Sequence, residues 1–161
     1  MRFNASILQN GLGLLMIALL AFACSKTNKP AGSNSQDIPA DLQIQFGEGG
    51  GFTGMWQGYT IQADGTVSTW QGRTVGDKPE VIGKLSSEQL QALWREVQSA
   101  DFFAQSLSET GNMTAILQVT ANKKQHVVKW PAASAQALPQ AASLQQLQSF
   151  CQKLVDSLEK E

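Results

Sequence analysis

The chain has 161 residues, with 12 lysines and arginines against 13 aspartates and glutamates, and a formal net charge of −1. A balance this close to neutral gives no basic surface for nucleic acid or for acidic lipid, so neither class of partner is expected. The length allows one domain with a single modest core.

The first 23 residues are typical of a secretory signal peptide. Arg2 precedes an apolar run over 11–23, which is shorter than the ~20 residues that a membrane span needs. The stretch "LLAFAC", which ends at Cys24, resembles the lipobox of bacterial lipoproteins, whose cysteine is lipidated. The resemblance implies stable membrane anchoring in the bacterial cell envelope through two or more acyl chains on Cys24. Ser25 rather than Asp follows, which favours the outer membrane; a secreted soluble protein is the alternative.

Residues 25–40 read "SKTNKPAGSNSQDIPA" and are rich in polar residues, Gly and Pro. This composition predicts a flexible tether, with a typical reach of ~20–25 Å. The lipidated cysteine and its tether therefore cover 24–40, and a single domain covers 41–161.

Period-two alternation predicts the first strands. "LQIQF" (42–46) places its apolar residues on one side, as in a half-buried strand. After a glycine-rich loop, residues 55–70 alternate again around the turn sequence "QADG". A three-residue loop there pairs Ile61 with Val67 and keeps apolar residues on one face of the sheet.

This register divides the large side chains between the two faces. Met55 joins the core face, whereas Trp56 and Trp70 point to the outer face, with Trp70 opposite Gly58. Two indoles on an outer face would form a platform for a binding partner. The alternative is that the loop 72–84 or the tether folds over them.

A helix is predicted within 85–103, where Ser86 and Gln89 form a capping box between Leu85 and Leu90. Its apolar residues recur at helical spacing, so one stripe of the helix is buried.

The rest of the chain predicts a hairpin over 113–121 and 125–130, then a final helix over roughly 140–159. The resulting order is βββ-α-ββ-α. We therefore expect an α+β fold, with an antiparallel sheet of about five strands and two helices packed on one face.

The loop "FGEGGGFTG" (46–54) contains Gly49, Gly51 and Gly54 in the spacing G-x-G-x-x-G. A dinucleotide site requires a helix after such a loop, but a strand pattern follows here, so no nucleotide is expected. Glycine also permits positive φ and close backbone approach. The loop would then present its main chain and Phe52 to a partner, unless Phe52 tucks into the core. The candidate binding residues are Gly50, Gly51, Phe52, Thr53, Gly54, Trp56 and Trp70.

Catalytic groups are few. His126 is the only histidine, and no motif places a nucleophile beside it. Lipidation of Cys24 leaves Cys151 without a disulfide partner, and its helical position favours a buried apolar role. No cluster of metal ligands is visible. We expect no catalytic residue, no metal and no cofactor, although the sequence does not show whether Cys151 and His126 meet.

Four stretches, in chain order, resemble emfourin, the protealysin inhibitor family: "GGGFTG", "LQALWREVQSADFF", "AILQVTANKKQHVVKW" and "LPQAASLQQL". Members inhibit thermolysin-like zinc metalloproteases by covering the active-site cleft. The resemblance implies a protein partner, such as a metalloprotease, with residues 50–54 near the binding edge. Thr53 replaces the usual Ala, and 72–84 resembles an insertion. The alternative is a non-catalytic envelope lipoprotein with a structural or assembly role, docking through Trp56 and Trp70.

Overall fold

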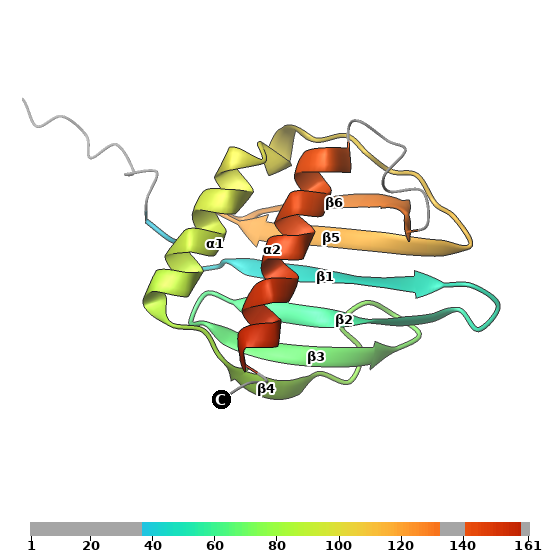
Figure 1. The fold of residues 1–161 in the computed structure, drawn as a ribbon, viewed down its shortest axis with the longest axis horizontal. Helices are drawn as coiled ribbons and strands as arrows, with labels where there is room; N and C mark the ends of the chain where they lie inside the picture. Colours follow the sequence, from blue (N-terminus) through green and yellow to red (C-terminus); the bar gives the residue numbers. More distant parts are fainter. Residues whose placement is uncertain (1–36, 133–140, 159–161) are drawn as a thin grey trace, which may run out of the picture. The chain divides into compact units, whose positions relative to one another are not determined.

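A computed structural model describes residues 37–132 and 141–158 of the chain (Figure 1). These residues form a six-stranded antiparallel sheet, and both helices cover the same face of it. The predicted α+β class is confirmed, with an order of ββββ-α-ββ-α. The signal peptide, Cys24 and most of the tether lie outside the described residues.

The sheet has the strand order β4-β3-β2-β1-β5-β6, with β1 near its centre. Its strands are β1 (Gln43–Gly50), β2 (Met55–Gln62), β3 (Thr66–Gly72), β4 (Glu80–Lys84), β5 (Met113–Ala121) and β6 (Lys124–Pro131). The helices are α1 (Ser87–Ser99) and α2 (Ala142–Leu158), and a 3₁₀ turn, η1 (Phe102–Ala104), follows α1.

The predicted register of β2 and β3 is confirmed, because Ile61 pairs with Val67 across a three-residue connection. Gly65 ends that connection with a φ of 86°, a conformation that a β-carbon disfavours. The carboxylate of Asp64 accepts hydrogen bonds from the amide and the hydroxyl of Thr66, at 2.9 and 2.8 Å. Local turn chemistry thus sets the strand pairing.

The turn between β5 and β6 holds the start of the domain. Asn122 and Lys123 both have positive φ, as a two-residue hairpin turn requires. The Asp41 carboxylate accepts hydrogen bonds from their amides at 2.8 and 2.6 Å. These hydrogen bonds, the one from Lys123 more than the one from Asn122, lower the pKa of Asp41. Residue 41 is therefore attached to the end of the sheet opposite the glycine loop.

The capping box at the start of α1 is also confirmed. Ser86 Oγ accepts from the amide of Gln89 at 3.2 Å, and Gln89 Oε1 accepts from the amide of Ser86 at 2.8 Å. The cap fixes where the helix begins, so that its apolar stripe faces the sheet.

The core lies between the helices and the face of the sheet that they cover, which we call the helix face. All of its buried residues belong to the compact unit Ser33–Glu161. Its members include Ile44, Phe46, Ile61, Leu117, Val119, Trp94, Leu147 and Cys151.

Strand β4 was not predicted from the sequence. Its residues are mostly exposed, with Val81 at 66% relative exposure, so no apolar alternation marks it. The strand exists because it pairs with β3 at the sheet's edge, and the register shifts between Val67 and Ser68. At Gly83 a β-carbon would lie 3.1 Å from Leu158 Cδ1 of α2, so the missing side chain lets the helix approach closely.

Candidate functional site

The glycine-rich loop joins β1 directly to β2, as predicted, and no helix follows it. Gly50, Gly51 and Gly54 have φ values of 106°, 63° and 61°, which explains the need for glycine. The Gly51 amide donates a hydrogen bond to the carbonyl of Asn112, and the Gly54 amide donates to that of Gly50. The hydroxyl of Thr53 accepts a hydrogen bond from the amide of Met55, the first residue of β2, at 3.3 Å. Hydrogen bonds within the turn and to Asn112 therefore stabilise its conformation.

Phe52 lies at the tip of this turn and has a relative exposure of 107%. Of the two alternatives left open by the sequence, the one in which Phe52 tucks into the core is therefore wrong. Met55 and Met113 pair with Gly50 from the two neighbouring strands, and each has 36% relative exposure. We call Phe52, Met55 and Met113 the turn surface.

Met55 was expected to belong to the core. It does project from the helix face, in register with Tyr59 and Ile61. The two helices, however, stop short of the end of the sheet where β1 turns into β2 (Figure 1). Met55 therefore lies on the correct face but remains partly exposed.

The two indoles do not form an exposed platform. Trp70 pairs with Gly58, as predicted, but has only 1% relative exposure. The segment 73–79 returns over this outer face, and a β-carbon at Gly76 would lie 2.8 Å from Gln45 Nε2 on β1. The alternative in which the loop after β3 covers the indoles thus applies to Trp70.

Trp56 is half-buried because its ring lies against the backbone of β1. A β-carbon at Gly49, its pairing partner, would lie only 2.3 Å from Cδ2 of the indole. Trp56 also lines a depression of about 340 Å³ beside Gly50, Met55 and Met113. Of the two indoles, only Trp56 lies at the turn and keeps some exposure.

A groove that the sequence analysis missed lies next to the turn. It has a volume of about 430 Å³ and is bounded by α2 and by β1, β2 and β3. We call it the glutamine groove, after the four glutamines among its polar lining residues, which are Glu48, Gln57, Tyr59, Thr69, Gln71, Gln148 and Gln152.

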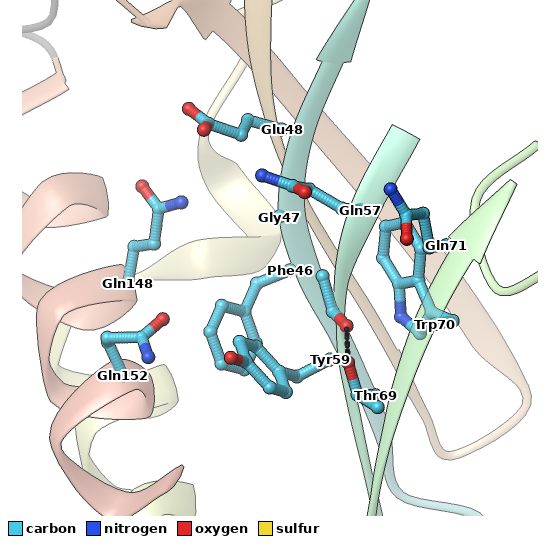
Figure 2. Close-up of a pocket in the computed structure, with 11 residues that line it drawn as sticks. Phe46, Gly47, Glu48, Gln57, Tyr59, Thr69, Trp70, Gln71, Gln148 and Gln152 are labelled. Carbon is cyan, nitrogen blue, oxygen red and sulfur yellow. Dashed lines mark hydrogen bonds between the residues drawn. The ribbon is translucent and has the colours of Figure 1, made fainter. Parts of the chain in front are cut away.

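Figure 2 shows how these residues surround the groove. Glu48 and Gln57 come from the sheet, and Gln148 and Gln152 face them from α2. The rings of Phe46 and Tyr59 lie between the two sides, with centroids 5.5 Å apart. The arrangement presents amide, carboxylate and phenol groups above an aromatic floor.

The groove and the turn surface are continuous. Glu48, Gln57 and Gln71 line both the groove and the depression beside Met55 and Met113. These three residues form one row across the sheet, since Glu48 pairs with Gln57 and Gln57 with Gln71. A signal for this row was present in the sequence: each residue stands where the alternation calls for an apolar, core-facing side chain.

The groups considered for catalysis lie apart from this surface. Cys151 is buried in the core, and burial raises the pKa of its thiol to about 12, so it stays protonated near neutral pH. His126 packs against Phe102 and Phe103, and its Nε2 lies 2.7 Å from the carbonyl oxygen of Gln105.

Within residues 37–132 and 141–158, no group of three or more His, Cys, Asp or Glu side chains is arranged to hold a metal. In the same residues, neither helix has the length and apolar character to span a bilayer.

The chain was compared with protein-family models and with curated proteins, and neither comparison finds a match.

Proposed function

We propose that this protein is a membrane-anchored, protein-binding module that engages its partner through the turn surface. The observation that carries the proposal is the full exposure of Phe52 on a turn fixed by hydrogen bonds. A phenylalanine side chain gains about 1.5–3 kcal/mol from full burial, and the fold leaves that gain unused. Binding of a partner would recover it.

The character of the turn surface fits a protein partner. Aromatic residues and methionine are enriched at the centres of protein interfaces, and methionine adapts to irregular surfaces. A turn already held by the Gly51 and Gly54 hydrogen bonds loses little conformational entropy on binding. Phe52 would then act as the anchor residue, with Met55 and Met113 beside it.

The class of partner comes from the resemblance to emfourin, which includes the sequence of this turn. It makes a thermolysin-like zinc metalloprotease the first partner to test, with the domain acting as its inhibitor. The lipobox resemblance supports a location at the bacterial cell envelope, where the lipid anchor on Cys24 would keep the inhibitor on the membrane.

Inhibition of thermolysin by the unit Ser33–Glu161 tests the specific partner. We expect inhibition at micromolar concentrations, and Phe52→Ala should weaken it by at least tenfold. Phe103→Ala is the matched control, since Phe103 is an exposed phenylalanine, at 39%, that belongs to η1 instead of the turn. Absence of inhibition by the unaltered unit would reject the metalloprotease as partner.

Photocrosslinking tests the broader proposal in cells that produce the full chain. A benzoylphenylalanine at position 52 should capture a discrete protein, whereas the same group at position 103 should not. Capture at position 56 but not at 52 would instead favour the structural or assembly role, with docking through the outer face. The burial of Trp70 removes one of the two indoles from that docking surface.

A further inference from the structure

We infer that the glutamine groove is the second half of the interface and binds an extended peptide segment of the partner, with a lysine or arginine beside Glu48. The inference rests on the proposed function, because the segment would continue from the turn surface into the groove. It adds the chemistry of the ligand, which the turn surface alone does not define.

Charge selects the basic side chain. Of the residues that the structure describes, Glu48 is the only charged one that lines the groove, and its side chain is exposed. Among the described residues, Glu48 has no ion pair and no side-chain hydrogen bond. A carboxylate that nothing neutralises, partly enclosed by uncharged groups, attracts a cation more strongly than one in open water.

The amides select an extended peptide. The side-chain amides of Gln57, Gln71 and Gln148 each have a carbonyl oxygen and an NH₂ group. The structure gives none of these three side chains a hydrogen-bond partner within the described part of the chain. A glutamine amide can therefore match both the N–H and the C=O groups of a peptide main chain. The volume of about 430 Å³ lies within the roughly 300–1,000 Å³ typical of ligand sites.

The strand register sets the spacing that the ligand needs. Met55 and Met113 flank Gly50, and Glu48 and Gln57 form the next row on the same face. Rows two residues apart are separated by about 7 Å, which is also the distance between residues i and i+2 of an extended peptide. A segment lying along the strands would thus place an apolar side chain on the methionines and a basic one beside Glu48.

The structure therefore predicts a recognition pattern of the form apolar-x-Lys/Arg. Beyond the basic residue, the next row contains Tyr59, and Gln148 and Gln152 of α2 face it across the groove (Figure 2). A polar residue two positions further on would meet these groups.

Selection of random nine-residue peptides displayed on phage, against the immobilised Ser33–Glu161 unit, tests the pattern. This unit contains the whole buried core, so it is a suitable target. We expect the selected peptides to be enriched in apolar-x-Lys/Arg. Their affinity should fall at least tenfold with Glu48→Gln and rise with Gln148→Glu, which adds a second carboxylate to the groove.

Glu80→Gln is the matched control, because Glu80 is an exposed glutamate at the start of β4 that does not line the groove. Its affinity for the selected peptides should equal that of the unaltered unit. Recovery of no binding peptide, of peptides without a basic residue, or of peptides whose affinity is unchanged by Glu48→Gln would each overturn the inference. Crosslinking at position 52 does not depend on Glu48, so it judges the proposed function separately.

Discussion

Two regions of the molecule combine a large aromatic side chain with glycines: the outer face beneath the segment 73–79, and the glycine turn. The aromatic side chain is buried in the first region and exposed in the second. On the outer face, Trp70 packs against Gly58 and is covered, so the glycine makes room for a side chain. At the turn, the glycines bend the chain sharply, and Phe52 is left exposed. Glycines next to an aromatic residue can therefore either make room for a buried side chain or form a turn that exposes it. The exposed fraction of the aromatic side chain tells the two cases apart.

Replacing the two aromatic residues should give the largest contrast. Trp70→Ala should destabilise the fold by about 3–5 kcal/mol, because it removes a large buried side chain and leaves a cavity. Phe52→Ala should change stability by less than about 0.5 kcal/mol, since the side chain contacts solvent. Urea denaturation of both variants measures the contrast. A large loss from Phe52→Ala would show that the turn is structural and that the comparison is wrong.

Replacing a glycine on the outer face should again destabilise the fold more than replacing a glycine in the turn, but the difference should be smaller. A β-carbon at Gly58 would lie 2.2 Å from the Phe46 carbonyl oxygen, so Gly58→Ala should cost about 2–3 kcal/mol through overpacking. A β-carbon at Gly54 would meet nothing within 4 Å. Gly54→Ala should therefore cost only the strain of positive φ, about 1–2 kcal/mol. Equal losses in thermal denaturation would mean that space is not what distinguishes the two sites.

The smallest effect on stability is expected from replacing carboxylates. Here too, one group is used by the fold and another is left without a partner. Asp41 accepts two backbone hydrogen bonds, whereas Glu48 has no partner among the described residues. Asp41→Asn should therefore lower the melting temperature at neutral pH, and Glu48→Gln should leave it nearly unchanged.

The pH dependence gives a second measurement of the Asp41 effect. Hydrogen bonds from Lys123 and Asn122 lower the pKa of Asp41 in the folded chain. Its contribution is therefore complete above the unfolded pKa of about 3.9, and it is lost as the pH falls through the lower, folded value. The difference in melting temperature between the unaltered protein and Asp41→Asn should narrow below about pH 4. A difference that stayed constant to pH 2 would contradict a role for the charged form.

Several features of the fold could be predicted from the sequence because they depend on near neighbours in the chain. The three-residue connection before Thr66 and the capping box at Ser86 are formed by residues a few positions apart. Alternation then assigned Ile61 and Val67 to the same face. The glycines at 50, 51 and 54 were correctly associated with a turn between strands, because a strand pattern follows them and glycine tolerates the positive φ of such a turn.

Other features depended on segments distant in the chain. Strand β4 has no apolar alternation and exists only because β3 is there to pair with it. Trp70 is buried because the segment 73–79 returns as far as Gln45 of β1.

The glutamine groove required the same long-range information, because Glu48 and Gln148 are brought together by α2 packing across the sheet. Alternation could place Glu48, Gln57 and Gln71 on the helix face, but not show where the helices end. The sequence alone therefore determined the pairing of β2 with β3 and the position of the glycine turn, through local backbone preferences. Which side chains are covered and which remain available was determined by packing between distant segments, because burial is a property of the assembled layers.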